Sequence, residues 1–180
     1  MRSARLWYNA ATFGQTRMKN SATFRFGLYL PLVVVLLSLA PDVRAGDVVI
    51  LTYAGPIGPI SAEYISRGIA EAESRGAAAV ILELDTPGGL DSSMREIIQR
   101  EMNARVPVVV YVAPRGARAA SAGCLILLAA DVAAMAPGTN IGAAHPITLS
   151  GGPVSEKIVN DAVAYARSLA AAHRRNEDWA

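Results

Sequence analysis

Apolar runs alternate with stretches of helical periodicity along most of the chain. Three apolar runs have the length of strands, and they span Asp47–Tyr53, Ala78–Leu84 and Val108–Val112. The second is apolar throughout except for Glu83, which predicts a strand covered on both faces. Between them, apolar residues recur three and four positions apart, which predicts helices over 61–75 and 90–103. Because strands and helices alternate, the pattern predicts an α/β fold whose strands pair mostly in parallel.

The same pattern continues towards the end of the sequence and predicts some local details. It indicates a short strand at 132–136 and a last helix at 155–173. Ser61 is expected to cap the first helix and Gly76 to end it. One face of the last helix is apolar, and we expect it to be buried; its residues are Val159, Ala162, Val163, Ala166 and Leu169.

The first 45 residues differ from the rest in charge and in apolar pattern. They hold six of the 17 basic side chains and one of the 15 acidic ones, so the remainder is mildly acidic, without the basic stripe that binds nucleic acid. The apolar run 26–39 is short for a membrane span, and a proline and small residues follow it. We predict a signal peptide over 1–45, cleaved after Ala45, and therefore export. The alternative is an uncleaved anchor; translation from Met18 would give the signal ordinary proportions.

One serine stands among small residues after the third predicted strand. The sequence there is G-A-R-A-A-S-A-G, Gly116–Gly123, and an apolar helical run follows it. At a strand-to-helix turn, Ser121 can present its hydroxyl in a tight bend, and the small neighbours let a substrate backbone come close. Ser121 is therefore the candidate nucleophile. The alternative is a serine that only caps a helix or permits close packing.

A pair of glycines follows the second predicted strand, in D-T-P-G-G, Asp85–Gly89. Glycines directly after a buried strand leave backbone N–H groups free to point at a ligand. Such groups can form an oxyanion hole, in which donors fixed in advance stabilise the charge that develops in a transition state. The alternative is that the pair is only a turn.

A serine nucleophile needs a base, and two residues are candidates. Lys157 falls in the first turn of the last predicted helix, where the helix dipole disfavours a charged ammonium and favours the neutral amine. His145 is the other candidate, with Asp85 or Asp131 to orient it. Spacing alone does not choose between them. We expect His173 to be solvated and Cys124 to be a small buried residue. No cluster has metal-ligand spacing and no glycine loop matches a nucleotide fingerprint, so no cofactor is expected.

Taken together, four segments resemble the N-terminal protease domain of the NfeD family. NfeD proteins are membrane-bound serine proteases, often encoded beside a stomatin-like protein, and they are similar in fold to Clp protease and signal peptide peptidase A. The resemblance implies a Clp/crotonase-like fold of ββα units. The matching segments are D-T-P-G-G (Asp85–Gly89), Y-V-A-P-R-G-A-R-A-A-S-A-G (Tyr111–Gly123), A-M-A-P-G-T-N-I-G-A-A-H-P (Ala134–Pro146) and K-I-V-N-D-A-V-A-Y (Lys157–Tyr165).

The resemblance also implies roles for individual residues. Ser121 and Lys157 would form a Ser-Lys dyad, with the amides of Gly88 or Gly89 and of Ala122 as oxyanion donors. Clp protease has a histidine at about the position of His145, which keeps that residue as the alternative base. Substrates would be hydrophobic segments, including the apolar tail of a stomatin-like partner. We also expect a homodimer.

Family members usually continue beyond this point with further protease structure, membrane spans and a small β-barrel domain. We therefore interpret residues 46–180 as a C-terminally truncated protease domain, periplasmic or extracytoplasmic and membrane-associated. A second hypothesis is a truncated domain that binds an apolar peptide or a membrane partner without cleaving it. A third is a crotonase-like acyl-CoA enzyme, which export argues against because coenzyme A is cytosolic.

Overall fold

The computed structural model describes residues 46–147 and 152–180. All of them belong to one unit of the chain, Ala45–Ala180. The predicted signal peptide lies outside the described residues. Among those residues, no helix combines the length and the apolar character needed to cross a bilayer.

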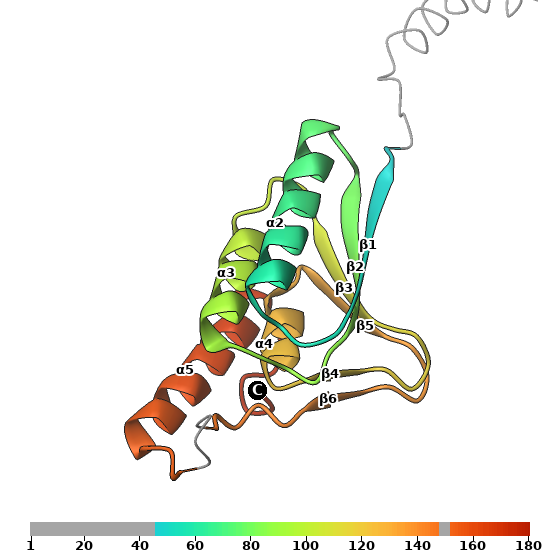
Figure 1. Cartoon of the computed structure of the whole chain (residues 1–180). Coiled ribbons are helices and arrows are strands. Elements are labelled where there is room, and N and C mark those ends of the chain that lie inside the picture. The colour runs from blue at the N-terminus through green and yellow to red at the C-terminus, as the bar shows by residue number, and fades with distance from the viewer. Residues whose placement is uncertain (1–45, 148–151) are drawn as a thin grey trace, which may run out of the picture. The chain divides into compact units, whose positions relative to one another are not determined.

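Within the described residues, the main sheet consists of four parallel strands in the order β1-β2-β3-β5 (Figure 1). The central strand pairs align Leu51 with Leu82 and Leu82 with Val110, and these side chains are buried. The parallel α/β fold predicted from the sequence is confirmed. The strands are β1 (Val48–Ala54), β2 (Ala79–Asp85), β3 (Val108–Val112) and β5 (Val132–Met135).

Helices cover one face of this sheet (Figure 1). Helix α2 (Pro59–Ser74) packs on β1 and β2 and against α3 (Asp91–Met102), and α3 in turn packs against α4 (Ala122–Ala129). The core lies between these helices and the sheet, because their apolar stripes meet the buried positions of the strands. Its largest fully buried side chains include Ile57, Ile65, Ile69, Leu84, Ile97, Ile98 and Ile126.

The opposite face of the sheet is less covered than the sequence predicts. Burial alternates along β2 and β3, so every second side chain points away from the helices and is only half-buried. At the two edges the exposure is larger, with Val48 at 48%, Ile50 at 59% and Val132 at 51%. The apolar run Ala78–Leu84 is predicted to be covered on both faces; among the described residues only one face of this strand is fully buried.

Two very short parallel strands form a second sheet, which the sequence analysis does not predict. Strand β4 (Arg118–Ala120) pairs with β6 (Asn140–Gly142), and Thr86 forms an isolated parallel bridge to Ala119. This small sheet lies at the carboxyl ends of β2 and β3, directly before Ser121. It brings the loop after β2 and the loop after β5 to the same place.

Helix α2 begins earlier than predicted. Pro59 occupies its first turn and Gly58 its N-cap, because the fixed φ of proline suits the start of a helix. Ser61 is therefore inside the helix, where its buried hydroxyl accepts from the Gly58 N–H at 2.9 Å and donates to the Gly58 carbonyl at 2.8 Å. Gly76 ends the helix with a φ of 62°, as expected.

The last helix, α5 (Glu156–Ala172), is buried over its C-terminal half only. Ala166 and Leu169 are buried, but Val163 is 42% exposed, which corrects the prediction of one continuous buried face. The reason is length: α5 packs against α4, whose eight residues span about 12 Å, roughly half the length of α5. Arg95 on α3 also holds α5, through an ion pair with Asp161 at 2.9 Å and by lying over the Tyr165 ring.

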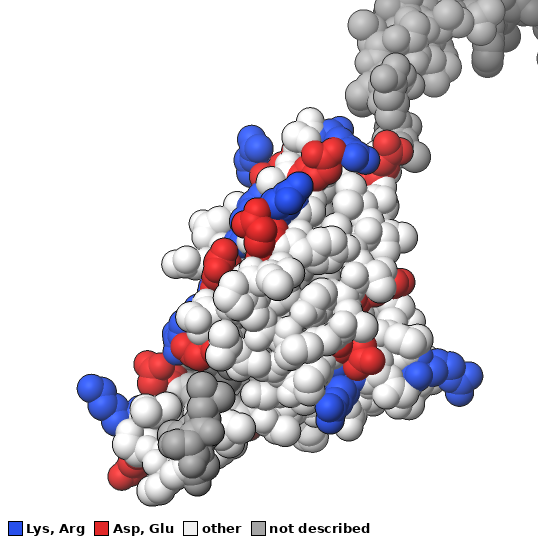
Figure 2. Space-filling view, viewed as in Figure 1, with Lys and Arg blue, Asp and Glu red and all other residues white. Residues whose placement is uncertain are grey.

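The charged side chains of the two exposed helices are mixed in sign. Figure 2 shows acidic and basic groups interspersed along α2 and α3. Arg75 pairs with Glu71 on α2, and Arg100 reaches from α3 to Glu73 at 2.8 Å. The Arg100 guanidinium and the backbone N–H of Arg105 both donate hydrogen bonds to the Glu73 carboxylate, and these bonds lower the pKa of Glu73 to about 2. The Arg100–Glu73 pair joins the C-terminal ends of α2 and α3, away from the small second sheet.

Glu101 is an acidic residue buried in α3. Its side chain is 3% exposed, and neither carboxylate oxygen has a hydrogen-bond partner among the described residues. Burial raises the pKa of Glu101 well above its ordinary value of 4.5, and the charge of Asp131 raises it further. The folded protein therefore retains a proton at a pH where the unfolded chain has released it.

Because the folded state binds this proton more tightly, the free energy of unfolding decreases as pH rises above the ordinary carboxyl range. Glu101→Gln is expected to raise the free energy of unfolding by about 1–3 kcal/mol near pH 8, with little gain at about pH 4. Urea denaturation at both pH values measures this. Glu96→Gln, at an exposed position of the same helix, is the control. An equal effect of Glu101→Gln at both pH values would contradict the prediction.

Candidate active site

Ser121 stands between β4 and α4 in an unusual backbone conformation. Its φ of 53° and ψ of −117° are rare for any residue except glycine and cost about 1–3 kcal/mol. Its N–H donates to the Gly142 carbonyl at 2.8 Å and its own carbonyl accepts from the Cys124 N–H at 3.0 Å. The hydroxyl makes no capping hydrogen bond, although Ser121 is the N-cap of α4. Within the described residues the Ser121 hydroxyl has no hydrogen-bond partner, so it is available for another role.

The glycine pair lies directly against this serine. A Cβ atom built on Gly88 would lie 2.5 Å from the Ser121 Cβ and 3.1 Å from its Oγ, and the φ of Gly88 is +106°. Gly89 is equally restricted, because a Cβ there would lie 2.0 Å from the Ile57 carbonyl oxygen. Both positions therefore need glycine. The fold brings together two segments that the sequence analysis identified separately.

The oxyanion donors proposed from the sequence differ in their hydrogen bonds. The Gly88 N–H donates to the Thr86 Oγ1 at 3.1 Å. By contrast, the N–H groups of Gly89 and Ala122 have no hydrogen-bond partner within 46–147 and 152–180. Gly89 is exposed and Ala122 is the first residue of α4. Two free amides thus belong to the two segments that meet at Ser121.

Lys157 lies in the first turn of α5, in the half of that helix that α4 does not cover. Its side chain is exposed rather than covered by apolar neighbours. In the described part of the chain it makes no hydrogen bond or ion pair, and the same is true of the Ser121 hydroxyl. The structure does not join the two groups by a hydrogen bond.

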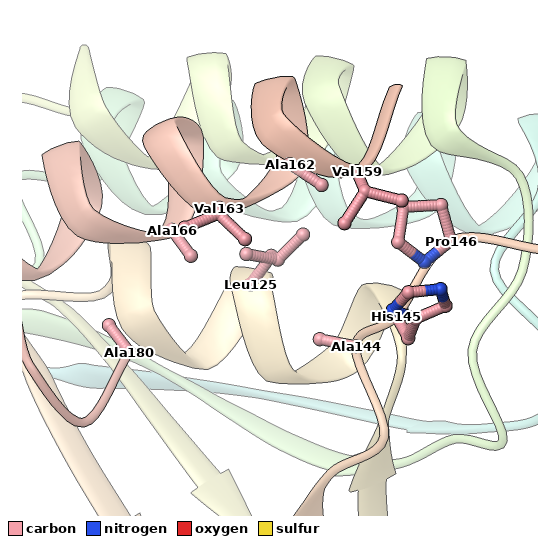
Figure 3. A pocket seen from close by; sticks show the side chains of 9 residues that line it. All are labelled: Leu125, Ala144, His145, Pro146, Val159, Ala162, Val163, Ala166 and Ala180. Atoms are coloured by element: carbon pink, nitrogen blue, oxygen red, sulfur yellow. The ribbon is translucent and has the colours of Figure 1, made fainter. Parts of the chain in front are cut away.

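His145 borders an apolar cleft of about 190 Å³ between α4, α5 and the segment after β6 (Figure 3). The cleft begins one helical turn after Ser121, at Leu125. Neither proposed orienting acid bonds to His145: Asp85 accepts the Arg118 N–H at 3.0 Å, and Asp131 accepts the Val108 N–H at 2.8 Å. The remaining lining residues are Ala144, Pro146, Val159, Ala162, Val163, Ala166 and Ala180.

Two further side chains were assigned environments from the sequence. Cys124 is half-buried, and burial raises the pKa of its thiol, which disfavours the nucleophilic thiolate. His173 was expected to be solvated but is half-buried, and its Nε2 atom has no partner among the described residues. It ends the half of α5 that packs against α4, which explains why it is covered. No group of three His, Cys, Asp or Glu side chains among the described residues is placed to hold a metal ion.

Comparison with known proteins places the chain in a family. The family model described as "NfeD1b, N-terminal domain" matches residues 49–180. The chain belongs to the NfeD1b N-terminal domain family. It is 42% identical over 150 residues to the membrane-bound protease PH1510 of Pyrococcus horikoshii. This match covers 80% of this chain and 34% of PH1510. It is 33% identical over 119 residues to membrane protein NfeD1b of Bacillus subtilis, covering 66% of this chain and 26% of that protein.

Solved structures of a relative support the fold of this NfeD1b-family domain. A serine-to-alanine variant of the 1510-N membrane-bound stomatin-specific protease superposes with a TM-score of 0.72 at 40% identity, over 76% of this chain and 68% of that one. A lysine-to-alanine variant of the same protease, in complex with a substrate peptide, gives the same TM-score and identity over 64% of its chain. The present chain thus spans about a third of PH1510 and about two thirds of the solved domain.

Sequence reasoning on this NfeD1b-family domain missed two residues that shape the site, Thr86 and Gly142. Gly142 holds Ser121 through its carbonyl, and Thr86 contacts the glycine pair. Gly142 belongs to a strand of three residues, which leaves no periodic pattern in the sequence. Thr86 stands within D-T-P-G-G, so its position next to the glycines was the signal that could have identified it.

Gly88→Ala is expected to disrupt the site for two reasons. The added methyl group would overlap the Ser121 Cβ, and the alanine would have to adopt a positive φ that disfavours any residue with a side chain. We expect the free energy of unfolding to fall by about 1–3 kcal/mol, and reaction of Ser121 with a fluorophosphonate to slow by about tenfold or more. Urea denaturation and labelling kinetics measure the two effects. Gly138→Ala is the control, since Gly138 has a φ of +78° but nothing within 4 Å of an added Cβ. Equal labelling of the two variants would contradict the expectation.

Proposed function

We propose that this domain is the catalytic domain of an exported serine endopeptidase that cleaves hydrophobic peptide segments. The observation that carries the proposal is the strained Ser121, which lies against Gly88; in the described part of the chain, its hydroxyl and the N–H groups of Gly89 and Ala122 have no hydrogen-bond partner. Free donors beside a nucleophile are what acyl transfer requires. That relatives in the family are membrane-bound proteases supports the same reaction.

In the proposed mechanism, the Ser121 Oγ attacks the carbonyl carbon of the scissile peptide bond. The Lys157 Nζ accepts the hydroxyl proton and then donates it to the leaving amine, completing a Ser-Lys dyad. The amides of Gly89 and Ala122 stabilise the oxyanion, because the Gly88 N–H is bonded to Thr86, and water hydrolyses the acyl-enzyme. Because Lys157 and Ser121 are not hydrogen-bonded in the described structure, this mechanism requires the Lys157 Nζ to come within hydrogen-bond distance of the Ser121 Oγ when substrate binds. His145 is the alternative base.

The chemistry of the cleft supports an apolar substrate. Leu125, which follows Ser121 by four residues on α4, and Val159 and Val163 on α5 present aliphatic side chains to the cleft (Figure 3). The 1510-N relative is specific for a stomatin homologue, and the structure of one variant has been solved in complex with a substrate peptide. We therefore infer that the physiological partner is a stomatin-like membrane protein. From the family resemblance we further propose that the domain acts as a homodimer at the outer side of the membrane.

Labelling with a fluorophosphonate tests the proposed nucleophile. The reagent should form one adduct, which peptide mapping by mass spectrometry places on Ser121, and an excess of an apolar peptide should slow its formation. Denatured protein serves as the control for nonspecific reaction. An adduct on another serine, or a rate that is the same in denatured protein, would overturn the assignment.

A second candidate function is binding of an apolar peptide without cleavage. The missing hydrogen bond between Ser121 and either base favours it. Purified protein would then bind a hydrophobic peptide and leave it intact during prolonged incubation. Fragments detected by mass spectrometry, and absent when Ser121 has been blocked by the fluorophosphonate, would exclude this function.

A further inference from the structure

Thr86 is a fully buried polar residue between the glycine pair and the segment that carries Ser121. Its relative exposure is 0%. It is neither the candidate nucleophile nor one of the candidate bases, and its N–H group is bonded to the Arg118 carbonyl and is not an oxyanion donor. Its contacts nevertheless reach every segment that forms the proposed oxyanion hole.

The backbone of Thr86 is bonded to β4. Its N–H donates to the Arg118 carbonyl at 2.7 Å, and its carbonyl accepts from the Ala120 N–H at 3.0 Å. These two bonds form the parallel bridge to Ala119. The start of the glycine loop is therefore held at a fixed position relative to the residue immediately before Ser121.

The side chain of Thr86 contacts the glycine loop and helix α4 at once. Its Oγ1 accepts the Gly88 N–H at 3.1 Å. A Cβ built on Gly123 would lie only 2.4 Å from the Thr86 methyl group, so this methyl group packs against the first turn of α4. One side chain thus uses its hydroxyl on the glycine loop and its methyl group on the helix that begins after Ser121.

The hydrogen bonds on the two sides of Gly88 determine the direction of the next amide. The Gly88 N–H donates to the Thr86 hydroxyl, and the Gly88 carbonyl accepts from the Ile57 N–H at 2.8 Å and from the Thr86 hydroxyl at 3.4 Å. Because a peptide group is planar, fixing the Gly88 carbonyl also fixes the N–H of Gly89. A glycine has no side chain to restrict its rotation, so without these bonds the peptide groups beside Gly88 would be free to turn.

We propose that Thr86 is a positioning residue of the oxyanion hole: its hydroxyl orients the Gly88–Gly89 backbone so that a free amide faces the reacting carbonyl at Ser121. The inference rests on the proposed peptidase function. Donors that are already oriented stabilise the transition state without reorganisation, whereas donors that must first turn lose much of that effect. Thr86 therefore acts on the rate of the chemical step rather than on the binding of substrate.

Thr86→Val and Thr86→Ser separate the two halves of the side chain. Valine keeps the shape and loses the hydroxyl; serine keeps the hydroxyl and loses the methyl group. For an apolar peptide substrate, Thr86→Val should lower kcat about tenfold or more with KM changed less than about threefold, since removing an oxyanion donor altogether costs about 10²–10³. It should weaken a peptide boronic acid, which mimics the tetrahedral intermediate, by a similar factor. Thr86→Ser should restore most of kcat.

Thr52→Val is the matched control, because the Thr52 hydroxyl is bonded to Glu83 on the exposed sheet face. It should behave as the wild type. An active wild type whose Thr86→Val variant keeps full kcat and boronic acid affinity would overturn the inference and leave the peptidase intact. A variant Thr86→Ser as slow as Thr86→Val would also overturn it, because packing would then be the whole role. A wild type without turnover overturns both proposals.

Hydrogen exchange in the wild type tests the geometry even if Thr86→Val does not fold. The Gly88 amide proton, bonded to a buried hydroxyl, should exchange at least about tenfold more slowly than the Gly89 amide proton, which has no partner in the described chain. NMR of uniformly ¹⁵N-labelled protein resolves the two. Fast exchange at Gly88 would overturn the inference.

Discussion

Replacement of Ser121 by alanine is expected to abolish peptide hydrolysis. The hydroxyl is the proposed attacking group, and without it only binding and the oxyanion donors remain. We expect kcat for an apolar peptide to fall by about 10³-fold or more, because loss of a serine nucleophile removes nearly all of the acceleration that the catalytic groups supply. Fragment release followed by chromatography at saturating peptide measures this, and fluorophosphonate labelling should disappear with it.

The matched control for this change is Ser168→Ala on α5. The Ser168 hydroxyl is exposed and bonds only to the Tyr165 carbonyl of its own helix, so its removal should leave turnover within about twofold of the wild type. Circular dichroism should show that Ser121→Ala keeps its fold. Continued fragment release by a folded Ser121→Ala protein would show that Ser121 is not the nucleophile.

Lys157→Ala is the second change with a large expected effect. If Lys157 takes the proton from Ser121, its removal should lower kcat by about 10²–10⁴-fold, the range that a positioned acid or base supplies. His145→Ala should lower kcat by less than about fivefold and act mainly on KM, because His145 borders the apolar cleft. Steady-state kinetics of both variants with one apolar peptide separates these outcomes.

Arg167→Ala provides the control for loss of a cation from α5. Arg167 is exposed on the same helix and should be dispensable for turnover. If Lys157→Ala retained full turnover while His145→Ala abolished it, the base would be His145. That result would leave the nucleophile and the oxyanion donors as proposed.

The main sheet and its helices were predictable because each is long enough to show a pattern. Val108–Val112 has the predicted bounds, and the other strands and helices differ from their predictions by one or two residues at most ends. The exceptions have physical causes. Strands β4 and β6 have three residues each and no periodicity, and the proline at position 59 moved the start of α2 ahead of Ser61.

The candidate site was predictable in part, because two of its segments follow strands whose pattern is visible in the sequence. Ser121 and the glycine pair follow buried strands of a parallel sheet, and ligands of open α/β sheets bind beyond the carboxyl ends of such strands. Their hydrogen bonds could not be predicted, since the bond from the Gly88 N–H to Thr86 depends on the turn geometry. The base could not be chosen either. Lys157 and His145 lie on different segments, and spacing in the sequence does not give their distance from Ser121.

The partial cover of α5 has a consequence for how the proposed enzyme would work. Ser121 and its proposed amide donors lie in turns held at the carboxyl ends of the strands, whereas Lys157 is exposed in the half of α5 that is only partly covered in the described chain. Drawing that helix end inwards restricts its freedom, which is unfavourable unless new contacts compensate. An apolar segment lying between α4 and α5 would supply them. The free protein would then be nearly idle, and arrival of the correct polypeptide would itself complete the catalytic centre.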